Sequence, residues 1–388
     1  MEGGSKRGRI ASYNALKGLG AVGILFSHMS YLGAAENPFW WNFHHYFMRY
    51  GAVCSSFFFL CSGFLLHYTW KEGTGSGGHA FGVYLKKKLK RLYPLALFVF
   101  LLAVGVELLM PGNGVVTEGM QLGSPLWLFC VAANLLLFKA FIPDRRVFYS
   151  FHGPSWYISV LFFFYAAAFA FVRGLKSGTE ESRARWRRAT LICCAAAYTI
   201  ELVICVAVDR GVGGLENHSL YLTYVNPYFR IFGEGFAGIL LCEYMPRISR
   251  AVRKCSADLL EICGIAAFLC GMLLKNVIHT SLMNAWLQSA LMGFVLIAFR
   301  SDAGRVSGAL KRRPFQLLGD ISFELYMTHA FVYEGLPVAA GIVSGAMRGW
   351  LIAHAGTRFV ITFVLCVVFA WIVHFFLEQL TRKVLARV

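Results

Sequence analysis

Long apolar segments alternate with short polar or charged segments along the whole chain. Eleven of the apolar segments are candidates for helices at membrane depth, because each approaches the length that crosses a bilayer. The segments lie at about 14–33, 51–70, 92–110, 125–141, 155–172, 188–208, 227–244, 258–275, 284–300, 319–343 and 355–377. This pattern predicts an all-α polytopic membrane protein.

Basic residues decide how many segments cross, because cytoplasmic loops carry an excess of lysine and arginine. Lys6, Arg7 and Arg9 place the N-terminus inside. If 125–141 does not cross, four later basic segments also fall inside, namely 173–188, 247–254, 305–313 and 382–387. We therefore predict about ten transmembrane helices with both termini cytoplasmic. Segment 125–141 is predicted to be a re-entrant or externally packed helix, which needs protein cover at that depth.

Composition supports a membrane protein and excludes several other classes. The 388 residues are 57% hydrophobic and 15% charged, whereas globular domains carry about 25% charged residues. The net charge is +17, but the basic residues lie between apolar segments and do not alternate with aromatic residues. We therefore expect membrane lipid, and no nucleic acid, as a partner. The eleven cysteines form no CxxC pair, so we expect small buried side chains and no metal site.

The chain is predicted to form a single membrane domain over residues 1–388. Residues 1–9 and 378–388 are expected to be cytoplasmic tails, and 71–91 a cytoplasmic loop that is first glycine-rich and then basic. Gly73–Gly78 lacks the Gly-Lys-Ser/Thr ending of a phosphate-binding loop. Signal-peptide cleavage after Ala35 is the alternative at the N-terminus, but the interruption of the run by Ser27 and His28 favours a retained first span.

Two ionisable residues stand out in the first apolar segment. His28 follows Lys17 by eleven residues, so a helix places both on one face, roughly 16 Å apart along its axis. Ionisable groups inside a membrane are costly and mark functional sites. In the alternative interpretation, Lys17 extends to the interface and His28 hydrogen-bonds a neighbouring helix.

The basic run 86–91 precedes the third predicted span. Lys88 and Arg91 are one helical turn apart and could bind the phosphates of an anionic donor. The same run would also determine topology and anchor lipid headgroups, and the two interpretations are compatible.

Further polar residues interrupt the apolar segments, and each has a structural alternative. Ser62 precedes Gly63, a pair that also suits close helix packing. Trp156 begins a span and would suit an aromatic belt at the outer interface. Arg230 and Glu234 are four residues apart and could form an internal ion pair. Three residues share a face at helical spacing and include a second acid–base candidate: Ser322, Tyr326 and His329.

In this order, the motifs resemble those of the acyltransferase-3 family, integral-membrane enzymes that O-acylate surface polysaccharides. Lys17 and His28 resemble its Arg/Lys-x10-His, and Phe58 to Phe64 its Phe-Phe-x-x-Ser-Gly-Phe. The remaining four resemblances are Lys88 to Arg91 with Arg-x-x-Arg, Trp156 to Tyr165 with Trp-x-x-Ser-x5-Tyr, Arg230 to Gly238 with Arg-x3-Glu-x3-Gly, and Ser322 to His329 with Ser-x3-Tyr-x2-His. The family's number of spans, about ten, agrees with the number predicted from charge.

The resemblance implies transfer of an acyl group, expected to be acetyl, from cytoplasmic acetyl-CoA or another acyl-CoA. The acceptor would be a hydroxyl of an extracytoplasmic glycan or lipid-linked precursor, at the plasma (inner) membrane of a bacterial-type cell. His28 would be the general base or a transient acyl carrier. Lys17, Lys88 and Arg91 would bind the CoA phosphates, without a metal. Six residues would line the acyl path or acceptor pocket: Ser62, Trp156, Arg230, Glu234, Tyr326 and His329.

Two positions depart from the family pattern. Leu161 stands where many members carry a glutamate, which excludes a catalytic carboxylate there, and Leu380 replaces the proline of a C-terminal Glu-x-Pro. The absence of an appended hydrolase-like domain predicts a stand-alone enzyme. The alternative function is a transporter or flippase of a glycan or small anion, although the sequence carries no strong internal repeat. A structural or sensory membrane subunit is a third possibility.

Overall fold

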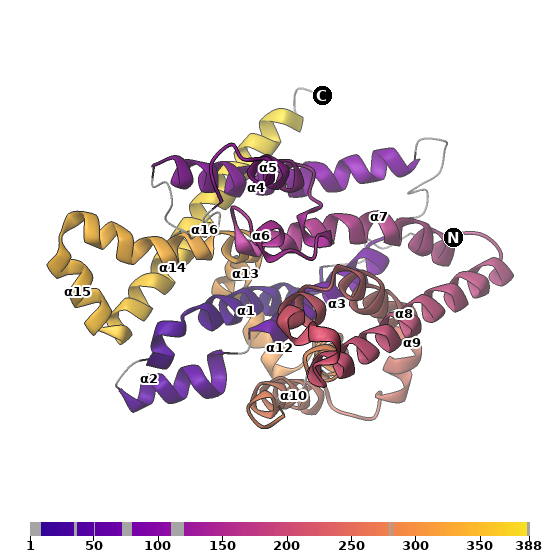
Figure 1. Cartoon of the computed structure of the whole chain (residues 1–388). Helices are drawn as coiled ribbons and strands as arrows, with labels where there is room; N and C mark the ends of the chain where they lie inside the picture. Colours follow the sequence, from indigo (N-terminus) through magenta and orange to yellow (C-terminus); the bar gives the residue numbers. More distant parts are fainter. Residues whose placement is uncertain are drawn as a thin grey trace. The chain divides into compact units, whose positions relative to one another are not determined.

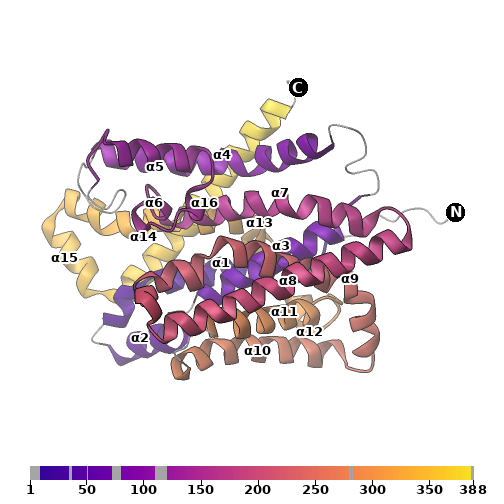
Figure 2. The same cartoon turned by 45° about the vertical axis from the view of Figure 1, so that its right-hand side comes forward.

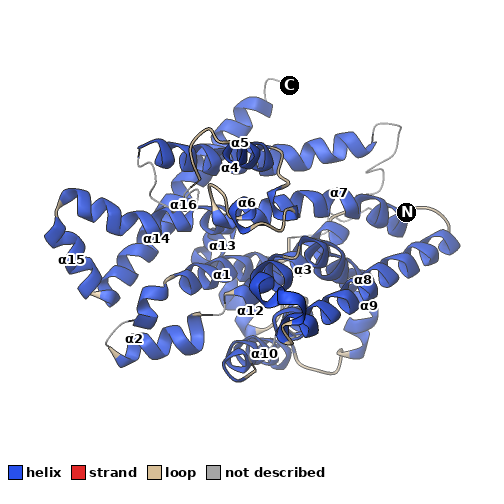
Figure 3. Cartoon of the chain, in the orientation of Figure 1, coloured by secondary structure: helices blue, strands red, loops and turns tan. Residues whose placement is uncertain are grey.

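The chain folds entirely into helices over the residues that the structure describes. This computed structural model describes residues 9–34, 37–49, 51–71, 80–109, 120–278, 281 and 283–385. Sixteen α-helices, α1 to α16, follow one another in these ranges with short 3-10 and π-helical turns between some of them (Figure 1). Figure 3 shows helices and loops there and no strand. The predicted all-α class is confirmed.

Among the described residues, six helical stretches are long and apolar enough to cross a membrane. They comprise Pro38–Tyr68, Ala80–Leu109, Gly153–Lys176, Glu180–Asp209, Ala257–Leu274 and Ala355–Leu380. Several are covered by protein on a minor part of their surface, and apolar side chains such as Ile192 and Val203 on α8 are exposed. Exposed apolar faces of this length suit lipid. These helices support an integral, multi-pass membrane protein.

Helices occur at each of the ten segments that the charge pattern predicts to cross. They are α1 (Ala11–His28), α3 (Ala52–Tyr68), α4 (Ala80–Leu109), α7 (Trp156–Lys176), α8 (Glu180–Asp209), α9 (Phe236–Ala251), α10 (Ala257–Val277), α11 (Gln288–Ala298), α14 (Ser322–Val343) and α16 (Ala355–Leu385). π-Helical turns, Phe229–Gly235 and Met283–Leu287, lead into α9 and α11. The shorter helices are α2 (Pro38–Phe43), α5 (Pro125–Leu135), α6 (Arg145–Phe148), α12 (Arg305–Leu310), α13 (Arg313–Asp320) and α15 (Gly345–Ala353).

Local sequence signals explain several helix boundaries. Ser124 caps α5 by accepting a hydrogen bond from the Trp127 backbone, and Pro125 follows at the first helical position. Thr179 caps α8 in the same way, ahead of two acidic residues that suit the positive end of the helix dipole. The predicted loop 71–91 is partly helical, because residues 80–91 form the first turns of α4. The glycine-rich segment 73–78 and most of the N-terminal tail lie outside the described residues.

The chain divides into two compact units. Unit 1 comprises Met1–Leu19, Ala52–Lys86 and Phe163–Asp320, and unit 2 comprises Gly20–Gly51, Lys87–Phe162 and Ile321–Val388. Helices α1, α4 and α7 therefore contribute residues to both units.

In unit 1, helix α3 packs against α9, α11 and the turn before α9, and α10 packs against α11 (Figure 2). Two glycines permit the closest of these contacts. A Cβ at Gly63 would lie 1.9 Å from the Gly235 carbonyl oxygen, and one at Gly238 would lie 2.1 Å from that of Leu60. Small residues at a helix interface allow such close backbone approach. The close packing that the sequence offered as an alternative at Ser62–Gly63 is present.

In unit 2, helix α14 packs against α15, α16 and the short turn Gly153–Ser155. A separate apolar cluster joins α4, α5 and the segment around α6, with Phe100, Cys130, Val147 and Phe151 buried in it. These contacts cover the side of α5 that carries Cys130.

Candidate active site

The last residue of α1 is His28, one of the two residues that the sequence singles out first. Its Nδ1 lies 2.9 Å from the Ile24 carbonyl oxygen, one helical turn earlier. A carbonyl oxygen can only accept a hydrogen bond, so Nδ1 carries the proton. In neutral His28, Nε2 therefore carries the lone pair. The side chain is exposed, so this lone pair is placed to accept a proton from a substrate.

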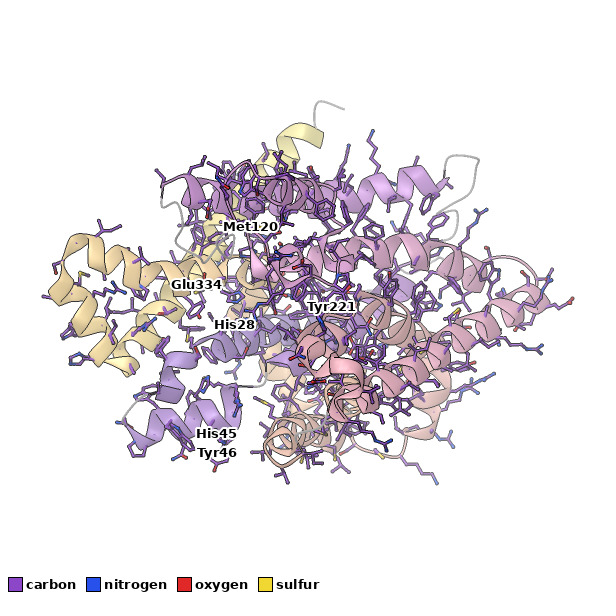
Figure 4. All side chains as sticks on the ribbon, in the orientation of Figure 1. His28, His45, Tyr46, Met120, Tyr221 and Glu334 are labelled. Atoms are coloured by element: carbon purple, nitrogen blue, oxygen red, sulfur yellow. The ribbon has the colours of Figure 1, made fainter. Side chains whose placement is uncertain are left out.

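A second imidazole lies beside His28. His329 on α14 is fully buried, and its ring centroid is 4.9 Å from that of His28. Its Nδ1 donates to the Tyr326 carbonyl oxygen at 2.7 Å, which again leaves the lone pair on Nε2. This Nε2 has no hydrogen-bond partner among the described residues. The labels of His28 and Glu334 in Figure 4 mark α1 and α14, the two helices that meet here.

Aromatic side chains lie near His329 in unit 2. Tyr326 is buried, with its ring 6.1 Å from that of His329 and 5.1 Å from that of Tyr157. Trp156, at the start of α7, is 3% exposed. Its side chain packs inside the protein, whereas a residue of an aromatic belt contacts lipid headgroups. Trp156, Tyr326 and His329, which the sequence placed on the acyl path, thus belong to the same unit as His28.

Two further polar residues of unit 2, His152 and Lys139, are buried and were not predicted from the sequence. His152 is 4% exposed, stacks on Phe331 at 4.6 Å and has no hydrogen-bond partner for either ring nitrogen among the described residues. Lys139 is 1% exposed and donates to the carbonyl oxygens of Ser150 at 2.9 Å and His152 at 2.7 Å. The signal available in the sequence was a lysine within an apolar segment and a histidine just before Trp156.

Burial changes the proton affinity of both groups. It lowers the pKa of the Lys139 ammonium to about 7, because the charged form loses its hydration. Burial also lowers the pKa of His152 well below its usual range, and the nearby charges of Lys139 and His329 act in the same direction. His152 is therefore neutral at physiological pH, with one N–H and one lone pair.

Arg230 and Glu234 form a buried ion pair in unit 1, at 2.6 Å. The Arg230 guanidinium also donates to the Tyr224 carbonyl oxygen and to Ser56, and Glu234 accepts from Ser289 at 2.8 Å. The ion pair that the sequence offered as an alternative is present. Its charged atoms are all occupied within the protein, which is typical of a structural network.

A family profile described as an acyltransferase domain matches residues 10–375 of the chain. The chain belongs to the acyltransferase-3 family. Acyltransferase MdmB of Streptomyces mycarofaciens is 24% identical over 358 residues, which cover 87% of this chain and 82% of that protein. No solved structure matches the chain. The resemblance identified from the motifs is therefore confirmed, and membership in the acyltransferase-3 family implies an acyl donor and an acceptor.

The cationic residues predicted to bind the donor of this acyltransferase-3 protein lie on two helices. Lys88 and Arg91 lie one turn apart on α4 in unit 2, the first half-buried and the second exposed. Lys17 lies on α1 within unit 1, half-buried and near Cys61, which precedes Ser62 on α3. The roles of Lys17, Ser62, Lys88 and Arg91 stay predictions.

The described residues contain no group of three or more histidine, cysteine, aspartate or glutamate side chains that could hold a metal ion. The described part of the site consists of imidazoles, phenols and one buried amine.

Proposed function

We propose that this protein transfers an acyl group, expected to be acetyl, from cytoplasmic acyl-CoA to a hydroxyl of an extracytoplasmic glycan or lipid-linked precursor. The observation that carries the proposal is the pair His28 and His329 in a chain of the acyltransferase-3 family. Each imidazole has its Nδ1 occupied by a carbonyl oxygen of its own helix. The lone pair that each keeps on Nε2 suits the proton transfer that an attacking hydroxyl requires.

The proposed topology has ten crossings and cytoplasmic termini, in the plasma membrane of a bacterial-type cell. The length of α5 supports it, because eleven helical residues rise about 16 Å and the hydrocarbon core is about 30 Å thick. The cluster that covers α5 supports a packed, non-crossing helix. In this topology the basic run in the first turns of α4 lies at the cytoplasmic surface, and His28 lies in the outer half of the membrane.

In the proposed reaction the acceptor oxygen attacks the carbonyl carbon of the thioester and forms a new C–O bond. The acceptor proton passes to Nε2 of His28, and the π electrons of the carbonyl move onto its oxygen. Collapse of this intermediate re-forms the carbonyl and breaks the C–S bond. The CoA thiolate then takes the proton back from His28. Direct transfer needs no acyl-histidine intermediate, so we propose His28 as the general base.

Lys88 and Arg91 are proposed to bind the phosphates of the donor, since charge-assisted hydrogen bonds to phosphate favour this kind of cluster. Lys17 on α1 is also proposed to bind the phosphates of the donor. A separate variant of Lys17 is needed to test this role. Arg230 and Glu234 are not part of the proposed reaction, because their charged atoms are already bound within unit 1.

The experiment compares surface glycans of cells that carry the wild-type protein, His28→Ala, His354→Ala or an empty vector. His354 is the matched control, because its Nδ1 also lies 2.8 Å from the carbonyl oxygen four residues earlier at a helix end. Mass spectrometry measures the acetyl mass added to the glycans, and the membrane fraction is assayed for the amount of each variant.

We expect acetylation with the wild type and with His354→Ala, and a loss of about 10²–10⁴-fold in rate with His28→Ala. Equal acetylation by His28→Ala would leave an acyltransferase but exclude His28 as its base. If no glycan gains mass in any strain, the proposed acceptor is wrong. Transport of an unmodified glycan by the wild type would then favour the transporter alternative.

A further inference from the structure

His152 lies beside the third turn of α14, where it stacks on Phe331 and interacts with His329. Tyr157 contacts Phe323 and Tyr326, with ring centroids at 6.4 and 5.1 Å, and His152 stacks on Phe331 at 4.6 Å. The segment 152–157 therefore runs along α14 and contacts residues that come before and after position 329 in the sequence. All of these residues belong to unit 2.

The backbone around His152 is held in place by two side chains. Lys139 Nζ and Ser155 Oγ both donate to the His152 carbonyl oxygen, each at 2.7 Å. Asn134 fixes the preceding turn through a hydrogen bond of 2.8 Å to Ser150 Oγ. Together with the stack on Phe331, these contacts define where the imidazole lies. A group held this firmly does not have to reorganise when charge develops near it.

The ring itself is buried, although neither of its nitrogens has a partner among the described residues. A buried polar group without a hydrogen bond costs about 1–3 kcal/mol, so such groups call for a reason. A neutral imidazole always has one N–H, and here that N–H has no acceptor in the described part of the chain. An acceptor supplied by a bound substrate would satisfy it.

The proposed reaction requires such a donor. Attack on the thioester places negative charge on the former carbonyl oxygen, which catalysis stabilises with preorganised N–H groups. His28 and His329 cannot supply one in their neutral forms, because each N–H is used on a backbone carbonyl oxygen. The His152 N–H is the imidazole N–H that the described site leaves unused, and the Lys139 ammonium lies nearby.

We propose that His152 is a further catalytic residue, whose N–H donates a hydrogen bond to the acyl carbonyl oxygen of the donor in the site of His28 and His329. This inference rests on the proposed function. No bond to His152 forms or breaks: its N–H stabilises the oxyanion while the acceptor proton moves to His28. His152 thus differs in role from the two histidines that the sequence identified.

The test uses full-length protein in isolated membranes, with deuterated acetyl-CoA as the probe and incorporation into envelope glycans as the readout. His152→Phe keeps an aromatic ring against Phe331 but removes the N–H. His152→Gln restores an N–H donor on a side chain of similar reach. The thermal midpoint of each purified variant is measured beside kcat and KM.

We expect His152→Phe to lower kcat about 10²–10³-fold with little change in KM or thermal midpoint, and His152→Gln to recover to within about tenfold of wild type. Retention of the wild-type rate by His152→Phe would overturn the inference while leaving the proposed function intact. Equal loss in both variants, accompanied by a lower thermal midpoint, would assign His152 a structural role instead. If the wild type incorporates no acetyl group, the proposed function itself fails.

Discussion

Two polar regions of this protein are buried to a similar extent but differ in how their hydrogen bonds are used. In unit 1, Arg230 and Glu234 are 1% and 0% exposed, and both are bound by neighbouring protein groups. In unit 2, His329 and His152 are equally buried, but Nε2 of the first and both ring nitrogens of the second have no partner among the described residues. A network whose polar groups all have protein partners stabilises the fold. Polar groups without protein partners are available to hydrogen-bond a substrate.

The largest effect that tests this comparison is expected from Arg230→Ala. Removing the guanidinium leaves Glu234 as an unpaired buried charge, which costs about 3–5 kcal/mol of stability. We expect a strong drop in the thermal midpoint of the purified protein and low abundance in membranes. The double variant Arg230→Met and Glu234→Leu removes both charges and should lower the thermal midpoint less than Arg230→Ala does. The comparison fails if Arg230→Ala folds normally and loses only activity.

Helix packing in unit 1 gives the next largest effect. Gly63→Ala places a Cβ 1.9 Å from the Gly235 carbonyl oxygen, so α3 must shift and we expect a loss of about 1–3 kcal/mol. Gly293→Ala on α11 is the matched control, because its Cβ would meet no atom within 4 Å. The control should be neutral or stabilising by up to about 1 kcal/mol. Thermal unfolding in detergent measures both, and equal midpoints would contradict the close contact.

Lys139 predicts a pH dependence of stability in unit 2. Its pKa is lowered to about 7 in the fold, whereas an unfolded lysine has a pKa of about 10.4. Between these values the unfolded chain binds more protons, so stability rises with pH from about 7 to about 10. Lys139→Met should make the thermal midpoint less dependent on pH across this range. If the thermal midpoint of the wild type falls over the same pH range and the variant behaves identically, the lowered pKa of buried Lys139 is contradicted.

The smallest effect is expected at the basic run in the first turns of α4. Lys88→Ala or Arg91→Ala should raise KM for acetyl-CoA by about three- to tenfold, with kcat nearly unchanged, because each removes one phosphate contact of about 1 kcal/mol. Lys86→Ala, an exposed lysine of the same run, is the matched control. The difference should shrink at high salt. Equal KM values for all three variants would assign the run to topology alone.

Much of the helical architecture was predictable because it depends on local sequence. The segment predicted at 155–172 corresponds to α7, and that at 355–377 lies within α16. The end of α1 was less predictable, since apolar residues continue past His28 while the helix stops there. The helical state of the basic run was also missed as a fold feature, because a charged segment between spans resembles a loop in hydropathy.

The candidate site was predictable in part. His28 and His329 could be found as single ionisable residues in apolar segments, but their contact joins positions 301 residues apart. His152 and Lys139 carried weak local signals, and it is tertiary burial that distinguishes them from ordinary loop residues. Trp156 suited an interfacial belt equally well until its neighbours were known.

The sequence alone determined the family, the helical class and the positions of the apolar helices. It could do so because a bilayer demands long apolar segments whose backbone hydrogen bonds are satisfied within the helix. The tertiary structure decided which polar groups have hydrogen-bond partners within the protein. Glu234 is bound by Ser289, 55 residues away. The His152 imidazole packs against Phe331 and has no hydrogen-bond partner in the described part of the chain. Such pairings depend on contacts between distant segments, and these contacts separate a structural ion pair from a candidate catalytic imidazole.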